Sequence, residues 1–243
     1  MNSNERVKNA IKRKKTDCIP VGPYMGNHCA AVAGIKLIDY YTKASKMAET
    51  QIKAWEIYGQ DVVCVQSDNY YIVEGFGLKT NYYENSTPVC IEPPVKDVKD
   101  IAGLKVPDPY KDGRMPVYVE AVDIVSKWFK KSVIVRTPGT GPFTMAGHLM
   151  GVQEFIMELA KIEHNMEGAD EKAIHYLLSL CTEALIKFGK AMLASGADTV
   201  QCADSLASLD MISPEMYEKF AFPYEKKYFD EIRSAAREKD AYT

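Results

Sequence analysis

The sequence predicts an α/β fold with a parallel sheet, because strand-like and helix-like segments alternate along the chain. Four short runs of mostly apolar or β-branched residues, 18–24, 61–66, 132–136 and 197–203, are each followed by a segment with helical spacing. Such alternation is typical of a doubly wound sheet or of a closed barrel. No G-x-G-x-x-G pattern follows the first run, which disfavours a dinucleotide-binding sheet.

Helices are predicted where apolar side chains recur every three or four residues. The last one begins at Ser213 and Pro214, a serine cap followed by a proline in the first turn, and it must kink or restart at Pro223. It is expected to end near Lys239, and residues 241–243 look like the start of a further strand. The other predicted helices cover residues 3–14, 45–58, 115–130, 152–159 and 170–195.

Residues 70–92 depart from this alternation and predict an antiparallel hairpin. Its β-rich pieces, 78–83 and 88–92, are separated by Asn85 and Ser86, which favour a turn. We expect the hairpin to lie over the pocket or over the edge of the sheet. Residues 93–113, rich in proline, glycine and aspartate, are expected to form a connector.

The composition indicates a globular protein and argues against several classes of partner. The chain has 243 residues, 47% of them hydrophobic, with a formal net charge of −3, so neither a nucleic-acid-binding surface nor a basic membrane-binding surface is expected. No apolar run approaches the ~18 residues of a membrane span, and the N-terminus lacks a signal-peptide core. The six cysteines are scattered without a C-x-x-C pair, which predicts reduced thiols and a cytoplasmic protein.

Polar residues follow the predicted strands at their carboxyl ends, where α/β proteins build their sites. Asp68 follows residues 61–66 and could act as a general acid or base, or hold a cationic or N–H group; it could equally be a turn aspartate. Asp204 and Ser205 follow residues 197–203 and could bind substrate or cap the next segment.

The glycine-rich stretch from Thr137 to Gly151 is the centre of the predicted site. Its turn could bind an anion on backbone N–H groups, or could simply connect a strand to a helix. Arg136 could pair with a carboxylate or sulfonate if its side chain points inward; it could equally be exposed. His148 could carry a proton or donate a hydrogen bond to a substrate oxygen, although a histidine at a helix start is more often structural.

Four stretches resemble the uroporphyrinogen decarboxylase superfamily, and within it the methylcobalamin:coenzyme M methyltransferase branch. They are Arg6 to Val21, Tyr58 to Gly77, Gly141 to Leu149, and Ser195 to Tyr224, in the family's order and spacing. The resemblance implies a (β/α)8 barrel. A single domain over residues 1–243 would then be roughly its first half, with the N-terminal helix, four βα units and the hairpin, and would stop before the fifth strand.

The resemblance also implies roles for single residues. Asp68 falls on the decarboxylase's catalytic aspartate, which holds pyrrole N–H groups. Ser205 falls on a substrate-contacting serine, and His148 falls where the decarboxylase has a tyrosine. The decarboxylases carry two arginines in the first loop, whereas residues 25–30 contain none. Because paired guanidinium groups are suited to holding the substrate's carboxylates, their absence disfavours decarboxylation of uroporphyrinogen.

The methyltransferase branch uses zinc to activate a thiol, on ligands that begin at the fifth strand. Any zinc is therefore expected from residues beyond Thr243. Within the chain no metal site is predicted, because His28 and Cys29 are adjacent and their side chains diverge.

We therefore expect a corrinoid-dependent methyltransferase that moves a methyl group between a methylcobamide, carried by a corrinoid protein, and a small thiol acceptor such as coenzyme M. The alternatives are a tetrapyrrole decarboxylase and a non-catalytic corrinoid- or tetrapyrrole-binding module. The predicted catalytic residues are Asp68 and His148. The predicted substrate-binding residues are Tyr24, His28, Asn69, Tyr70, Arg136, Asp204 and Ser205.

Overall fold

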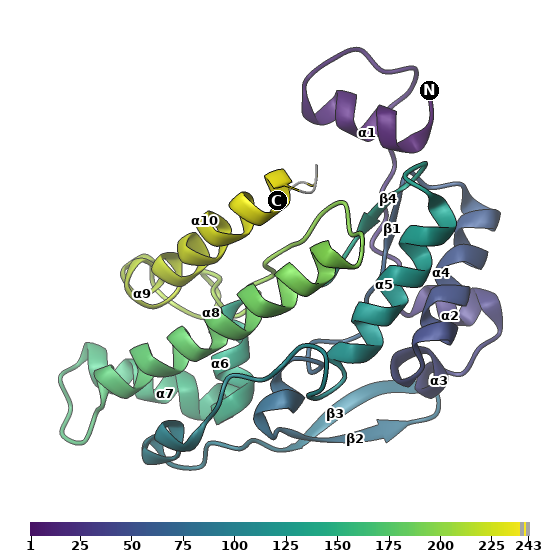
Figure 1. Cartoon of the computed structure of the whole chain (residues 1–243). Coiled ribbons are helices and arrows are strands. Elements are labelled where there is room, and N and C mark those ends of the chain that lie inside the picture. Colours follow the sequence, from purple (N-terminus) through teal and green to yellow (C-terminus); the bar gives the residue numbers. More distant parts are fainter. Residues whose placement is uncertain (239–240, 242–243) are drawn as a thin grey trace.

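The computed structural model describes residues 1–238 and 241 and has the predicted α/β character (Figure 1). At its centre, strand β1 (Val62–Cys64) pairs in parallel with strand β4 (Ile134–Arg136), with Cys64 opposite Arg136. Residues 197–203 continue this arrangement beside β4 through two isolated parallel bridges, at Thr199 and Ala203. Three neighbouring segments therefore run in one direction, as the alternation of the sequence predicts.

The prediction of a strand at residues 18–24 is wrong, because this segment belongs to no sheet. It is attached beside β1 by Val21, whose carbonyl accepts the N–H of Asp61 at 2.7 Å and whose N–H donates to the Asp61 carboxylate at 2.8 Å. Pro20 and Pro23 have no N–H to donate, so a hydrogen-bonded ladder cannot continue on either side.

The strand predicted at residues 197–203 is likewise reduced to its two bridges. At the start of this segment the Asp198 side chain accepts the N–H of Val135 at 3.0 Å, and the N–H of Thr137 donates to Thr199 O at 3.1 Å. The pairing lapses over residues 200–202 and resumes at Ala203, whose carbonyl accepts the N–H of Gly141 at 2.8 Å.

The core lies between this sheet and the helices that cover one of its faces. Alternate strand residues, among them Val63, Val135 and Val200, are buried in one cluster with side chains of α4 (Ala44–Tyr58), α5 (Met115–Phe129) and α8 (Glu171–Ala194). These three helices agree with the predicted ranges to within a residue. Successive side chains on a strand point to opposite faces. The residues directly before and after each of these valines therefore lie on the face of the sheet turned away from the helices.

The other helices include two that the sequence did not predict. Helix α1 (Ser3–Ile11) is shorter than expected, and α2 (His28–Ala33) and α3 (Leu37–Thr42) lie in a stretch for which no helix was predicted. The glycine-rich stretch leads into α6 (Pro142–Met150) and α7 (Val152–Glu163).

The C-terminal helices follow the predicted signals. Ser213 caps α9 (Pro214–Phe220), and the chain restarts as α10 (Phe222–Glu238) with Pro223 in its first turn. Helix α10 packs alongside α8 (Figure 1). The predicted helix end near Lys239, and all of the predicted strand 241–243 except Ala241, lie outside the described residues.

The hairpin is present as predicted. Strands β2 (Lys79–Tyr83) and β3 (Ser86–Glu92) pair in antiparallel fashion and lie against α3 (Figure 1). Short 3₁₀ turns flank it, η1 (Val73–Phe76) before it and η2 (Val98–Gly103) in the connector.

All six cysteines are free thiols, as expected. Among the described residues, no helix combines the length and apolar character that crossing a membrane requires.

Candidate functional site

The carboxylate of Asp68, just past β1, is held by Arg114. Nη1 and Nη2 of Arg114 donate to the two oxygens of Asp68, each at 2.7 Å, and Nε donates to Glu74 Oε2 at 2.8 Å. The side chains of Arg114, Asp68 and Glu74 are 7%, 4% and 7% exposed. Burial lowers the pKa of Arg114, but the hydrogen bonds to Asp68 and Glu74 outweigh it and raise the pKa above its ordinary value. One guanidinium thus lies between two buried carboxylates.

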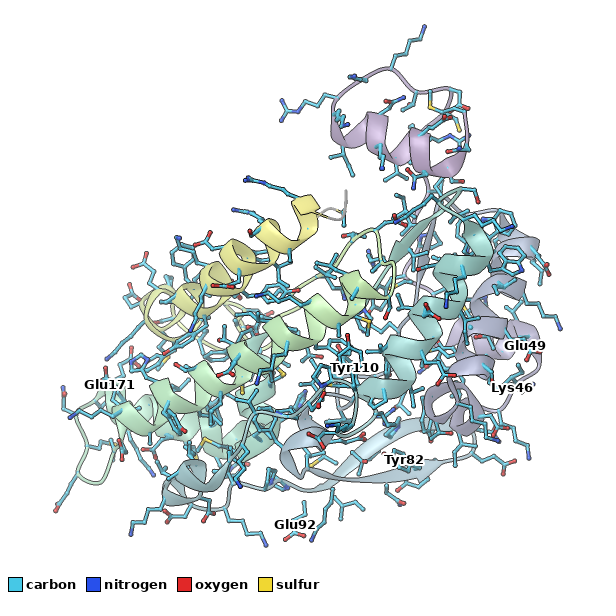
Figure 2. The ribbon with its side chains drawn as sticks, in the orientation of Figure 1. Lys46, Glu49, Tyr82, Glu92, Tyr110 and Glu171 are labelled. Carbon is cyan, nitrogen blue, oxygen red and sulfur yellow. The ribbon has the colours of Figure 1, made fainter. Side chains whose placement is uncertain are left out.

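The same cluster fastens the hairpin to the rest of the molecule. Thr80 and Tyr82 on β2 donate to Glu74 Oε1 at 2.7 Å and 3.0 Å. The ring of Tyr82, seen on the hairpin in Figure 2, lies 5.3 Å from the Arg114 guanidinium carbon. Asp68 Oδ1 also accepts the N–H of Tyr70 at 2.9 Å. Both Asp68 oxygens are therefore engaged within the protein, and substrate N–H groups would have to displace Arg114 to bind them.

His148, on α6, lies against the ring of Tyr70. The two ring centroids are 5.0 Å apart in an edge-to-face arrangement. The Nε2 atom of His148 is buried and, among the described residues, has no hydrogen-bond partner. Burial lowers the pKa of His148, so the imidazole is neutral at pH 7. The structure therefore brings together three predicted residues, Asp68, Tyr70 and His148, and leaves the buried His148 Nε2 without a partner among the described residues.

Asp204 caps the helix that carries His148. Its Oδ2 accepts the N–H of Phe143 at 3.0 Å and its Oδ1 accepts the N–H of Thr144 at 2.6 Å, both in the first turn of α6. Burial nevertheless raises the pKa of Asp204 to about 6. A Cβ added at Gly141 would lie 2.3 Å from Asp204 Cγ, so the turn needs glycine at this position. The Asp204 side chain therefore caps α6, which precedes it in the chain, whereas the sequence predicted either substrate binding or a cap on the segment that follows.

Arg136 ends β4 on the face of the sheet turned away from the helices. Its Nε donates to Cys64 Sγ at 3.5 Å, and its guanidinium carbon lies 4.9 Å from the centroid of the Tyr24 ring. Gln201 and Gln66 lie on the same face, with Gln201 Nε2 donating to Gln66 Oε1 at 3.3 Å. Arg136 and Tyr24 are thus brought together, in a polar cluster at the carboxyl ends of the parallel segments.

The remaining predicted residues lie outside these contacts. Asn69 and Ser205 are exposed. His28 is exposed on α2, and its Nε2 lies 3.0 Å from the hydroxyl of Tyr58, at the end of α4. His28 therefore packs against a helix end rather than against Asp68 or His148.

Two residues that organise the site were not foreseen. Arg114 is separated from Asp68 by 46 positions in the sequence, and its place between the connector and α5 gives no local signal. Tyr71 is fully buried, and its hydroxyl accepts the N–H of Thr140 at 3.1 Å, holding the glycine-rich turn. The sequence signal that could have indicated Tyr71 is its position directly after Tyr70, near the end of a predicted strand.

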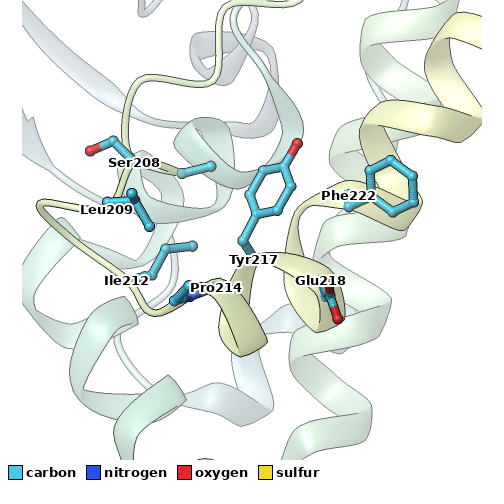
Figure 3. A pocket seen from close by; sticks show the side chains of 8 residues that line it. Ser208, Leu209, Ile212, Pro214, Tyr217, Glu218 and Phe222 are labelled. Atoms are coloured by element: carbon cyan, nitrogen blue, oxygen red, sulfur yellow. The ribbon is translucent and has the colours of Figure 1, made fainter.

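A separate cavity of about 840 Å³ opens beyond Ser205, between the following loop and the helices α9 and α10 (Figure 3). The Tyr217 hydroxyl, in its wall, donates to Glu225 at 2.7 Å. None of the predicted site residues lines this cavity, so we do not place the site there. Its lining is Ala207, Ser208, Leu209, Ile212, Pro214, Tyr217, Glu218 and Phe222.

A resident metal finds no set of ligands in the described part of the chain, where no three histidine, cysteine or acidic side chains gather. The described residues therefore offer no zinc site of their own, and no chemical step is derived through a metal.

Comparison with known proteins agrees with this arrangement. The sequence model described as "Uroporphyrinogen decarboxylase (URO-D)" matches residues 2–239. The methylcobamide:CoM methyltransferase MtbA of Methanosarcina acetivorans is 28% identical over 94% of this chain and 66% of its own length. The uroporphyrinogen decarboxylase of Carboxydothermus hydrogenoformans is 27% identical over 95% of this chain and 65% of its own length.

A solved methyltransferase from Methanosarcina mazei superposes on 96% of this chain and 67% of its own, with a TM-score of 0.81 and 26% identity. The chain thus spans about 66% of the length of MtbA from M. acetivorans. Because the family model covers nearly all of the chain, the protein belongs to the uroporphyrinogen decarboxylase (URO-D) family, whose members include both methyltransferases and decarboxylases.

Proposed function

We propose that this chain belongs to a corrinoid-dependent methyltransferase that moves a methyl group from a methylcobamide to a thiol such as coenzyme M. The names of the MtbA relatives and of the Methanosarcina mazei structure support this choice within the family. The observation that carries it is the bidentate pairing of Asp68 with Arg114.

That pairing weighs against the decarboxylase alternative. The decarboxylase-like role of Asp68 requires a carboxylate free to hold pyrrole N–H groups, whereas both oxygens already accept guanidinium N–H groups at 2.7 Å. Arginines in the first loop would be needed to hold the substrate's carboxylates, and residues 25–30 contain none. Because decarboxylase relatives are 27–28% identical to this chain, decarboxylation is the second candidate function.

In the proposed reaction the thiol sulfur forms a bond to the methyl carbon. The cobalt–carbon bond of the donor breaks with its electron pair remaining on cobalt, and the thiol loses its proton. The neutral His148, with its free Nε2, is the group proposed to take that proton. Tyr70, beside it, and Tyr24 would form walls for the macrocycle.

Asp68 takes a positioning role in this proposal. Through the N–H of Tyr70 and through Arg114 it fixes the loop that carries Tyr70. Exposed Asn69 and Ser205 flank the same strand ends and would contact the donor at the mouth of the site.

The proposal extends to the fold and the setting. We assign the parallel segments to a single (β/α)8 barrel domain, because their polar face, with Arg136 and Gln201, is turned away from the covering helices as a barrel interior would be. The likeness to the Methanosarcina mazei methyltransferase supports this assignment. We further propose that a corrinoid protein carries the methyl donor. We also propose that the protein lies in the cytoplasm, where reducing conditions keep its cysteines as free thiols.

A product assay separates the candidates. Protein expressed from its complete gene would be incubated with methylcobalamin and 2-mercaptoethanesulfonate, and separately with uroporphyrinogen. Formation of the S-methyl thioether with no decarboxylated porphyrinogen is the expected result. Decarboxylation without thioether would establish the second candidate, and cobalamin binding without either product would indicate a binding module.

A further inference from the structure

We infer that Arg136 binds an oxyanion, a sulfonate or carboxylate, carried by the thiol acceptor. The identity of the bound molecule as the acceptor rests on the proposed methyl transfer. The binding of an oxyanion by Arg136 does not, because it follows from the surroundings of this guanidinium alone.

Arg136 differs from Arg6 and Arg114, the other arginines of the described chain that are at least partly buried, in having no acidic partner. Arg6 pairs with Asp17 and Asp61, and Arg114 pairs with Asp68 and Glu74. The polar side-chain contact of Arg136 is the one from Nε to Cys64 Sγ at 3.5 Å. Its Nη1 and Nη2 atoms carry four N–H donors that find no acceptor in residues 1–238 or at residue 241.

The side chain is nevertheless held in one place. The Tyr24 ring lies 4.9 Å from the guanidinium carbon, and Cys64 lies directly opposite Arg136 in the register of β1 and β4. A cation over an aromatic ring is attracted to its face. The residue is only partly exposed, so its charge is not fully compensated by water.

The groups around Arg136 bring no negative charge of their own. Burial raises the pKa of the Cys64 thiol and raises that of the Tyr24 hydroxyl to about 12, so both groups are neutral at pH 7. Gln66 and Gln201, which hydrogen-bond to each other, are uncharged. An arriving oxyanion would therefore meet an unopposed guanidinium whose parallel N–H groups match two of its oxygens.

The place of Arg136 points to the acceptor rather than to a structural ion. It is the last residue of β4, on the polar face, at the carboxyl end where α/β sheets bind their substrates. A phosphate within the corrinoid could use the same donors, and the experiment below distinguishes the two sources.

Calorimetric titration of the protein expressed from its complete gene tests the inference. Ethanesulfonate is the anionic probe, ethyl methyl sulfone its neutral analogue, and inorganic phosphate the third probe. We expect ethanesulfonate to bind, the sulfone not to bind, and phosphate to bind more weakly than ethanesulfonate. Arg136→Gln should weaken ethanesulfonate binding about tenfold or more. Arg136→Lys keeps the charge but not the paired N–H groups of the guanidinium, so its affinity for ethanesulfonate should be intermediate.

Arg233→Gln is the matched control, because Arg233 is exposed on α10 and stacks on Phe229 at 5.9 Å. It should bind ethanesulfonate like the unmodified protein. Unchanged affinity in a folded Arg136→Gln or Arg136→Lys variant, equal binding of the sulfone, or no binding of ethanesulfonate would overturn the inference. Phosphate binding in preference to ethanesulfonate would overturn its assignment to the acceptor.

The two proposals fail separately. Arg136-dependent binding of ethanesulfonate in a protein that transfers no methyl group would leave the inference standing without the proposed function. Methyl transfer with equal kcat/KM for anionic and neutral thiols would leave the function standing without the inference.

Discussion

Replacing Arg114 with methionine should destabilise the protein more than any change in a surface ion pair. The substitution keeps an apolar stem but leaves Asp68 and Glu74, 4% and 7% exposed, without their shared cation. Removing one partner of a buried ion pair costs about 3 to 5 kcal/mol, because the remaining charge stays buried. Asp68→Asn should cost less, since Arg114 would keep its bond of 2.8 Å to Glu74.

Urea unfolding measures this loss. With a slope of about 3 kcal/mol per molar urea, a loss of about 3 to 5 kcal/mol lowers the midpoint by about 1 to 1.7 M. Lys46→Ala is the control, because it removes the pair between Lys46 and Glu49 on the outer face of α4 (Figure 2), which is about half exposed. If Arg114→Met moved the midpoint no further than Lys46→Ala, the buried cluster would not hold the hairpin and the Asp68 loop as we describe.

Three further changes test the site. Tyr71→Phe removes the acceptor of the Thr140 N–H, and should lower the free energy of unfolding by about 1 to 3 kcal/mol in urea titrations. Because the pKa of Asp204 is raised from 3.8 to about 6 in the folded state, the folded state holds this proton more tightly, and the stability it contributes is lost as pH rises from about 4 to 6. Asp204→Asn should remove that fall in unfolding measurements across the same pH range. His148→Phe keeps a ring against Tyr70 but removes Nε2, and should lower kcat for methyl transfer by about 100-fold with little change in the urea midpoint.

Each of these has a clear contrary result. Full stability of Tyr71→Phe would show that the turn needs no support from that hydroxyl. An identical dependence of stability on pH in Asp204→Asn and the unmodified protein would remove Asp204 as its source. Full activity of His148→Phe would exclude His148 from proton transfer.

The longer elements of the fold could be predicted because their signals are local. Apolar periodicity over 170–195 predicted α8, and the Ser213–Pro214 pair predicted the start of α9. The short strands could not be bounded in this way. Whether residues 197–203 form a ladder depends on their pairing with β4 and the turn after it, far away in the sequence, and in the structure this pairing consists of bridges at Thr199 and Ala203.

The candidate site could be located but not explained from the sequence. Polar residues at strand ends pointed to Asp68, His148 and Arg136, and the structure gives each a distinct environment. The partners that define those environments lie far along the chain, as Arg114 does from Asp68. Long-range pairing of this kind depends on tertiary packing, which a single sequence does not reveal.

Isotope transfer is the most direct test of the central claim. Methylcobalamin carrying a trideuterated methyl group would be mixed with 2-mercaptoethanesulfonate and the protein expressed from its complete gene, and the thioether would be analysed by mass spectrometry. Protein-dependent formation of the trideuteromethyl thioether, with loss of the methylcobalamin absorbance, is the predicted result. No labelled thioether above the protein-free reaction, together with decarboxylation of uroporphyrinogen by the same preparation, would contradict the account.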